Sequence, residues 1–414
     1  MIGLGYIGLP TATLFASRKK TVIGVDVVPH VVDTVNQGRI HIIEPELDML
    51  VRAAVTAGWL RATLTPEPAD AFLVAVPTPF KDGHQPDLRH VEAAAKAIAP
   101  VLKPGDLVIL ESTSPVGSTE RLARWMAQAR PDLSFPQTAG EAADVQVAYC
   151  PERVLPGRVL HELVSNDRVI GGLTRKASEM AAALYKTFVE GECVITDART
   201  AELCKLTENS FRDVNIAFAN ELSLVCDKLG VNVWELIPLA NRHPRVNILQ
   251  PGAGVGGHCI AVDPWFIVDS APEEARLIRA AREVNDGKPA WVVGKVKAAV
   301  ADALAARPGR PLADVTVACL GLAFKPDIDD LRESPAVGIC AELARLGCRT
   351  VAVEPHIDTL PGRLARAGVG LAALDAALAD ADVVCVLVRH GAFAAAKDKI
   401  ARAGSVIDAV GLLR

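Results

Sequence analysis

Short apolar runs alternate with amphipathic helical patterns through the first half of the chain. The helical patterns, in which apolar positions recur at the spacing of one helix face, cover Leu9–Ser17, Leu88–Leu102 and Ser118–Arg130. The apolar runs are short enough for buried strands, and they cover Thr21–Val27, Ala71–Val76, Asp106–Leu110, Val145–Ala148 and Arg168–Ile170. This alternation predicts an α/β fold with a doubly wound sheet, whose ligand crevice lies at the carboxyl ends of the strands. We expect Pro131–Asp144, which has no clear period, to be a surface loop.

The last third of the chain restarts the alternation. A helical pattern covers Pro335–Leu346, and strand patterns cover Val315–Leu320, Thr350–Val353, Val383–Leu387 and Ser405–Ile407. Between the two halves, Thr200–Leu229 contains no proline or glycine and predicts one helix about 45 Å long. The predicted architecture is therefore two Rossmann-like doubly wound domains joined by a long central helix. A helix of this length usually links two domains, and we expect it to pair with its twin in a homodimer.

Composition narrows the class of protein. The 414 residues are too many for one core, and half of them are hydrophobic, so two or three domains can each bury a core. A net charge of -5 argues against a nucleic-acid partner. Nine scattered cysteines show neither paired nor metal-ligand spacing, so we expect a reducing cytoplasm, no disulfide framework and no metal. No apolar run reaches the roughly 20 residues of a membrane span, and we expect no membrane association and no cleavable signal.

A glycine motif opens the chain. Gly3, Gly5 and Gly8 form a G-x-G-x-x-G before a predicted helix, whose N-terminal amides would hold a pyrophosphate. Asp26 ends the next strand about 20 residues on, where an acid binds ribose hydroxyls, and no arginine directly follows it. The pattern favours NAD over NADP, and the alternative is a glycine turn with a helix-capping aspartate. Only two residues precede Gly3, so we expect either a clipped first strand or a start assigned too late, and a loosened cofactor pocket in both cases.

A second glycine-rich stretch, residues 252–264, presents Cys259 and Asp263 four residues apart. Such a loop can expose a reactive thiol, although a turn followed by an inert buried cysteine is the alternative. On the long helix, Lys205 and Asn209 share one face and could stabilise an oxyanion or move a proton, unless they are solvated surface residues.

Further polar residues stand where a ligand could meet them. Thr78, Thr113 and Glu152 follow predicted strands, where each could equally be a cap or turn former. His243 and Arg245 precede the thiol stretch and suit phosphate or sugar hydroxyls.

Five motifs in this order resemble the UDP-glucose/GDP-mannose dehydrogenase family over the whole chain: GLGYIGLP, CPERVLPG, AELCKLTEN, GVGGHCIAVDPWF and GLAFKPDIDDLRESPA. The run Gly-Gly-His-Cys followed by Val262-Asp263-Pro264 resembles the branch of the family that acts on N-acetylhexosamines, and NRHPRVNIL together with DPWF resembles its members that act on UDP-N-acetyl-D-mannosamine. The resemblance implies an NAD-binding Rossmann domain (1–195), a central helical dimerisation region with the cysteine loop (196–290) and a C-terminal UDP-sugar-binding domain (291–414). The expected substrate is UDP-N-acetyl-D-mannosamine, and UDP-N-acetylglucosamine is the alternative.

The resemblance also implies a four-electron oxidation of a primary alcohol to a carboxylate with two NAD. Lys205, or a water held by Asp263 and Glu152, would accept the alcohol proton, and Cys259 would form a thiohemiacetal and then a thioester. Asn209 would join Lys205 in stabilising the oxyanions. In the same family pattern the cofactor positions are Gly3, Gly5, Tyr6, Ile7, Gly8, Asp26, Thr78, Thr113 and Arg332. The substrate positions are Arg153, Val154, Lys205, Asn209, Arg212, His243, Arg245, Gly256 and Lys325.

One departure from the family pattern is a neutral Val410 where an arginine is expected, which bears on affinity or substrate identity and not on the reaction type. Two other classes stay open. A two-electron hydroxyacid dehydrogenase of the 6-phosphogluconate type would share the first domain but would need neither Cys259 nor the second nucleotide domain. A catalytically silent NAD-binding or nucleotide-sugar-binding protein would retain the fold alone.

Overall fold

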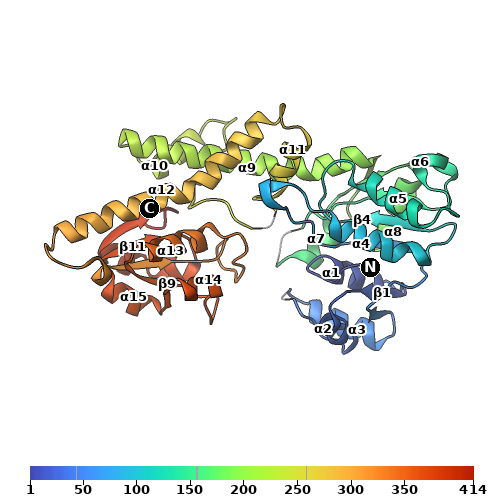
Figure 1. Ribbon diagram of the computed structural model, residues 1–414, viewed down its shortest axis with the longest axis horizontal. Coiled ribbons are helices and arrows are strands. Elements are labelled where there is room, and N and C mark those ends of the chain that lie inside the picture. The colour runs from blue at the N-terminus through green and yellow to red at the C-terminus, as the bar shows by residue number, and fades with distance from the viewer. Residues whose placement is uncertain (43, 155–156, 258) are drawn as a thin grey trace. The chain divides into compact units, whose positions relative to one another are not determined.

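The computed structural model describes residues 1–42, 44–154, 157–257 and 259–414. It divides into two compact units, an N-terminal unit (Met1–Glu208) and a C-terminal unit (Asn209–Arg414), and each is described by itself (Figure 1). Both units contain mainly parallel strands that alternate with helices, so the predicted fold class is confirmed.

The N-terminal unit is built on parallel strands with one reversal. Five of them are paired in the order β3-β4-β5-β6-β7: Ala71–Val74, Leu107–Leu110, Gln146–Tyr149, Arg168–Gly172 and Cys193–Asp197. β6 is antiparallel to β5 and parallel to β7. β1 (Val22–Val25) and β2 (Leu60–Thr63) form a separate parallel pair.

A single residue near the start of the chain joins these two sheets. Ile2 forms parallel bridges to Val25 and to Val74, with its amide donating to the Leu73 carbonyl at 2.7 Å and its carbonyl accepting from Ala75 at 2.8 Å. One bridging residue therefore lies between β1 and β3.

Helices cover both faces of this sheet because alternate strand residues point to opposite sides. Leu73, Ile109 and Ala148 belong to one apolar cluster, and Val74, Leu110 and Tyr149 belong to another. The helices of the unit are α1 (Gly8–Ser17), α2 (Pro29–Asn36), α3 (Leu47–Thr56), α4 (Arg89–Ile98), α5 (Ser118–Ala129), α6 (Pro136–Ala139), α7 (Val159–Ser165) and α8 (Arg175–Tyr185). The prediction of a surface loop over Pro131–Asp144 is wrong in part, because buried Phe135 and Pro136 anchor the short helix α6 there.

The long central helix is confirmed. α9 spans Ala198–Leu229, beginning two residues before the predicted start at Thr200, and it runs from the N-terminal into the C-terminal unit. In the C-terminal unit it is followed by α10 (Val233–Ala240), α11 (Asp263–Ser270) and α12 (Arg276–Ala305). α12 lies along the second half of α9, where buried Arg282 pairs with Asp213 at 2.7 Å.

The C-terminal unit contains a second doubly wound sheet, which is fully parallel. Its strand order is β10-β9-β8-β11-β12, comprising Gly370–Leu371, Arg349–Val353, Thr316–Leu320, Val383–Val386 and Ser405–Asp408. Val317 and Cys319 face a cluster that includes residues of α12, whereas Ala318 and Leu320 face the opposite cluster. The remaining helices are α13 (Pro335–Arg345), α14 (Gly362–Arg366), α15 (Leu374–Asp380), α16 (Gly391–Ala395) and α17 (Lys397–Arg402). The strand order reverses between β8 and β11, which marks the crevice where such sheets bind ligands.

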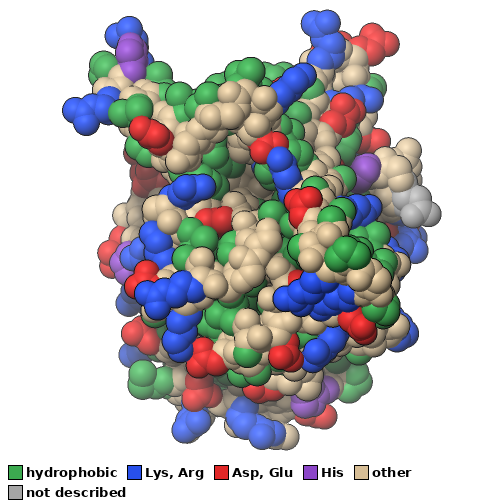
Figure 2. Space-filling model, turned by 90° about the vertical axis from the view of Figure 1, so that its left-hand side faces the viewer, with side chains coloured by type: hydrophobic (Ala, Val, Ile, Leu, Met, Phe, Trp, Pro, Cys, Tyr) green, Lys and Arg blue, Asp and Glu red, His purple; other side chains and the backbone are tan. Residues whose placement is uncertain are grey.

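The surface and the cysteines add three observations. On the face drawn in Figure 2, Lys and Arg side chains are interspersed with Asp and Glu side chains. Within the described part of the chain, none of the helices combines the length and apolar character that a bilayer span requires. All nine cysteines lie among the described residues, and none of them is in a disulfide bond.

Candidate functional site

The first glycine motif has the geometry of a dinucleotide-binding turn. Gly3 has φ +89°, and a Cβ there would lie 2.5 Å from the Ala75 carbonyl oxygen, so the tight turn requires glycine. A Cβ on Gly8 would collide with the Gly3 carbonyl, which brings the start of α1 close to the turn. At Gly5, by contrast, no described atom lies within 4 Å of an added Cβ, and this open backbone can approach a pyrophosphate. These residues fit the cofactor that the sequence predicts.

Asp26 closes this turn from the end of β1. Its carboxylate accepts hydrogen bonds from the backbone amides of Leu4 and Val28, each at 3.0 Å. The acid therefore lies against the glycine turn, where ribose hydroxyls of a bound dinucleotide would meet it. The neighbouring Tyr6 side chain is exposed and Ile7 is half-buried.

Thr78 and Thr113 meet at the carboxyl end of the same sheet. The Thr78 hydroxyl donates to the Thr113 carbonyl at 2.5 Å, and both residues are half-buried. Behind them, the Ser112 hydroxyl donates to the Val76 carbonyl at 2.7 Å. The two strand ends are thus joined at the edge where a Rossmann-like sheet binds its ligand.

Glu152 and Lys205 are near enough within the N-terminal unit for their charges to interact. Burial raises the pKa of Glu152, and the charge of nearby Lys205 opposes this rise. Lys205 itself is buried on α9, so the alternative of a solvated surface lysine does not apply. The next residue, Arg153, forms an ion pair with Glu208 at 2.7 Å, which the sequence patterns did not predict. Val154 is half-buried, and Leu155 and Pro156 of the same motif lie outside the described residues.

Glu111 belongs to a buried polar group that the sequence patterns did not predict. The Tyr185 hydroxyl donates to Glu111 at 2.5 Å, with buried Arg168 nearby. Burial raises the pKa of Glu111 to about 6. One feature of the sequence could have indicated Glu111. It is an acid that directly follows the apolar strand β4, and α/β sheets often carry functional side chains at this position.

In the C-terminal unit, three of the predicted catalytic residues come together. The Asn209 side chain donates to the Asp263 carboxylate at 2.5 Å. The Cys259 carbonyl accepts from the amides of Asp263 at 2.8 Å and Val262 at 3.0 Å, which begins α11 directly after the thiol. Cys259 is half-buried rather than sealed in a core, so the alternative of an inert buried cysteine is disfavoured.

Two loops of the C-terminal unit pack on each other. We call residues 252–257 and 259–262 the Cys259 loop, and residues 321–334 the Lys325 loop. The Gly257 amide donates to the Arg332 carbonyl at 3.2 Å. A Cβ on Gly256 would lie 2.5 Å from the Glu333 carbonyl oxygen and 2.9 Å from Phe324 Cβ. The glycines therefore allow the thiol-bearing backbone to rest directly on the loop that carries Lys325 and Arg332. His258 lies outside the described residues.

Other predicted ligand residues lie at the surface of the C-terminal unit. Arg212, His243, Arg245, Lys325 and Arg332 are all exposed. Arg332 pairs with Asp330 at 2.6 Å, and the Arg245 amide donates to His243 Nδ1 at 3.3 Å. Val410 is half-buried and packs against the apolar cluster that contains Leu320. The geometry of this unit thus gathers Asn209, Asp263 and Cys259, and leaves the basic residues around them exposed.

Comparisons with known proteins cover nearly the whole chain. Residues 1–189 match the NAD binding domain of the UDP-glucose/GDP-mannose dehydrogenase family, residues 199–287 its central domain and residues 318–414 its UDP binding domain. A UDP-N-acetyl-D-mannosamine dehydrogenase of Yersinia pestis is 65% identical over 418 residues, covering 100% of this chain and 98% of the relative. An NDP-N-acetyl-D-galactosaminuronic acid dehydrogenase of Ralstonia nicotianae is 66% identical over 394 residues, or 95% and 90% of the two chains.

Solved structures agree with these matches. The UDP-D-ManNAc dehydrogenase of Pyrococcus horikoshii superposes with a TM-score of 0.87 at 38% identity, covering 100% of this chain and 95% of the other. The UDP-N-acetyl-mannosamine dehydrogenase of S. aureus gives 0.85 at 39% identity, with 100% and 94% covered. The resemblance inferred from the five motifs is confirmed. The chain therefore belongs to the UDP-glucose/GDP-mannose dehydrogenase family, as an NAD-dependent nucleotide-sugar dehydrogenase.

Proposed function

We propose that this enzyme oxidises the primary alcohol of UDP-N-acetyl-D-mannosamine to a carboxylate, through a thioester on Cys259. The observation that carries the proposal is the hydrogen bond from Asn209 to Asp263 beside the backbone of Cys259. An amide donor, a carboxylate and an accessible thiol are the groups that acyl chemistry on a cysteine requires. Relatives named for this substrate at 65% identity support the choice of sugar.

The chemistry assigns one task to each residue. Lys205, or a water held by Asp263 and Glu152, takes the hydroxyl proton as the alcohol becomes an aldehyde. The Cys259 thiolate adds to the aldehyde carbon, and the resulting thiohemiacetal loses a second hydride to become a thioester. Water cleaves the thioester, which releases the carboxylate and restores the thiol. NAD held at the Gly3–Gly8 turn would supply the hydride acceptor for each of the two oxidations. Lys205 and Asn209 stabilise the negative oxygen of both tetrahedral species.

The binding roles are proposed on the family pattern. NAD is assigned to the Gly3–Gly8 turn with Asp26, to Thr78 and Thr113, and to Arg332. The nucleotide sugar is assigned to the cations and backbone of the substrate positions, which are Arg153, Val154, Arg212, His243, Arg245, Gly256 and Lys325. We also propose the three-domain division at residues 195 and 290, a homodimer formed through α9 and a cytoplasmic location, where the thiols stay reduced.

A second substrate remains a candidate because of one specific observation. The Ralstonia relative, at 66% identity, is named for an N-acetyl-D-galactosaminuronic acid, so this degree of similarity does not choose between the sugars. Val410 replaces the expected arginine and removes one cation from the substrate assignment. An NDP-N-acetylgalactosamine is therefore the alternative to test alongside UDP-N-acetylglucosamine.

The test is the number of NADH formed per nucleotide sugar consumed. Purified enzyme receives NAD and, separately, each of the three N-acetylhexosamine nucleotides, and the assay is repeated with Cys259→Ala. Two NADH per sugar, selective for the manno substrate and lost in the variant, is the expected result. One NADH per sugar, or a variant as active as the parent, would remove Cys259 from the mechanism. Faster turnover of the galacto substrate would replace the proposed sugar and keep the mechanism.

A further inference from the structure

Three strand ends of the C-terminal sheet carry a buried polar network that has no assigned role. Glu354 directly follows β9, His390 lies shortly after β11, and the Lys325 loop follows β8. Because these strands are parallel and adjacent, their carboxyl ends meet at one edge, at the point where the strand order reverses. His390 is fully buried and Glu354 is 5% exposed.

Glu354 holds the beginning of the Lys325 loop. Its Oε2 accepts from the amides of Leu322 at 2.7 Å and Ala323 at 3.0 Å, and it lies 3.0 Å from His390 Nε2. Burial alone would raise the pKa of Glu354, but the hydrogen bonds from His390 and the two amides outweigh it and hold the pKa below its usual range. The carboxylate is therefore charged, and each hydrogen bond to it is of the stronger, charge-assisted kind.

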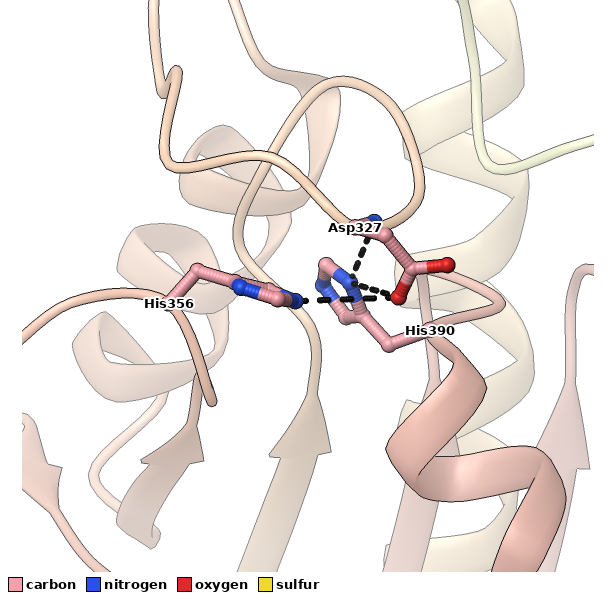
Figure 3. A group of neighbouring side chains, drawn as sticks. All are labelled: Asp327, His356 and His390. Carbon is pink, nitrogen blue, oxygen red and sulfur yellow. Dashed lines mark hydrogen bonds and ion pairs between the residues drawn. The ribbon is translucent and has the colours of Figure 1, made fainter. Parts of the chain in front are cut away.

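His390 holds the same loop on the far side of Lys325. Its Nδ1 accepts from the Asp327 amide at 2.9 Å (Figure 3). The Asp327 carboxylate in turn accepts from the Gly391 amide at 2.8 Å. An Nδ1 that accepts must be unprotonated, so the ring proton is on Nε2 and points to Glu354. The loop is thus pinned at residues 322–323 and at 327, on both sides of Lys325.

The same side chains do not favour a metal site. Asp327, His356 and His390 have ligand atoms within 4.8 Å of one another, as a bound cation would require (Figure 3). However, both His390 nitrogens already have hydrogen-bond partners, and a metal on Nδ1 would displace the Asp327 amide. His356 and Asp327 are 3.6 Å apart on the solvent side. The hydrogen bonds of His390 instead fit a structural role, in which they hold the Lys325 loop in place.

We infer that His390 and Glu354 are positioning residues for nucleotide-sugar binding, acting through Lys325. Glu354 fixes the tautomer of His390, and His390 fixes the backbone that carries Lys325, a proposed ligand of the nucleotide sugar. The inference rests on the proposed function insofar as Lys325 binds the nucleotide. It predicts that loss of the histidine weakens UDP binding far more than NAD binding, because all the groups assigned to NAD except Arg332 belong to the N-terminal unit, and Arg332 lies five residues beyond the pinned Asp327.

The experiment measures the Kd of UDP and of NAD by calorimetry, and the Tm, for full-length His390→Leu and His390→Asn. Leucine removes both hydrogen bonds, whereas asparagine keeps an acceptor near the Nδ1 position for the Asp327 amide. We expect leucine to raise the Kd of UDP about 10-fold or more, in line with a lost charge-coupled hydrogen bond, and asparagine to restore most of the affinity. In a Lys325→Ala background the leucine substitution should add almost nothing, since the two residues act in series.

Several outcomes would overturn the inference. If both variants lower the Tm but bind UDP as the parent does, the network serves stability alone. Fully additive effects of His390→Leu and Lys325→Ala would show that the histidine does not act through Lys325. If EDTA or added zinc changes the UDP affinity of the parent but not of His390→Asn, the cluster is a metal site. UDP binding does not depend on the sugar, so the inference can stand when turnover of UDP-N-acetyl-D-mannosamine fails, and can fail when that turnover is observed.

Discussion

Gly256→Ala tests whether the packing of the Cys259 loop on the Lys325 loop is needed for catalysis, apart from any effect on the stability of the C-terminal unit. The added Cβ would lie 2.5 Å from the Glu333 carbonyl oxygen, although ordinary van der Waals contact begins at 3.4 Å. It would also lie 2.7 Å from Pro335 and 2.9 Å from Phe324. The obstacles are a backbone carbonyl oxygen, a proline ring atom and the Phe324 Cβ, and none of them can rotate away, so one loop must move by roughly 1 Å. A misplacement of that size at a reacting group costs on the order of 100-fold in rate.

The assay is NADH formation at saturating NAD and nucleotide sugar, with the Tm measured in parallel. Gly287→Ala is the matched control, since Gly287 lies in α12 of the same unit and no described atom comes within 4 Å of its added Cβ. Alanine is the better helix former by up to about 1 kcal/mol, so this control should keep full activity and equal or greater stability. The expected contrast is a kcat about 100-fold lower for Gly256→Ala alone.

A Gly256→Ala enzyme with a kcat within a few-fold of the parent would refute the reasoning. It would mean that the Cys259 loop tolerates a shift of this size, or that the thiol is not the reacting group. An equal loss of activity in Gly287→Ala would instead point to a general effect of altering glycines in this unit.

Three further predictions concern buried charges and the cofactor. Burial raises the pKa of Glu111 from 4.5 to about 6. The protonated Glu111 side chain therefore contributes its full stabilisation below pH 4.5, and the free energy of unfolding falls by about 2 kcal/mol as the pH rises through 6. Glu111→Gln should remove this decline in urea denaturation between pH 5 and 7.5, and an unchanged slope would contradict it. Burial lowers the pKa of Lys288 from 10.5 to about 8. Between pH 8 and 10.5 the unfolded state therefore binds more protons than the folded state, and the free energy of unfolding should rise by about 3 kcal/mol over that range. Lys288→Met should abolish that rise in the same measurement. Asp26→Asn should weaken NAD binding about 10- to 100-fold with unchanged UDP affinity, as measured by fluorescence titration, because one charged acceptor for the ribose is lost.

The sequence patterns predicted those helices and strands whose own residues show a clear apolar pattern. Leu107–Leu110 is buried at every position, and the corresponding run in the sequence was found almost to the residue. β2 and β7 were missed because Leu60–Thr63 carries an exposed arginine and Cys193–Asp197 is largely exposed. The reversed direction of β6 was not foreseeable either, since a buried strand has the same pattern in both directions.

The candidate site also contains residues that a local motif predicts and residues that only the fold brings together. Gly3, Gly5 and Gly8 with Asp26 are close in sequence, and the conformation each glycine needs follows from its place in one turn. By contrast, His390 and Glu354 are 36 residues apart and belong to no local motif. They come together only because β9 and β11 flank β8 and all three strands end at the same side of the sheet. The pairing of Arg153 with Glu208 likewise depends on how α9 packs in the N-terminal unit.

The packing of the Cys259 loop on the Lys325 loop has a consequence for the reaction as a whole. Gly257, with φ +83°, lies against the Phe324 ring and donates to the Arg332 carbonyl, so the thiol and the proposed nucleotide ligand Lys325 share one scaffold. That scaffold is fixed in turn by Glu354 and His390. A substitution at either end should therefore raise KM for the nucleotide sugar and lower kcat together, whereas independent loops would let His390→Leu change KM alone. Measuring both constants in His390→Leu and in Gly256→Ala decides between these cases, because only a shared scaffold makes the histidine substitution slow the chemistry of a thiol that it does not touch.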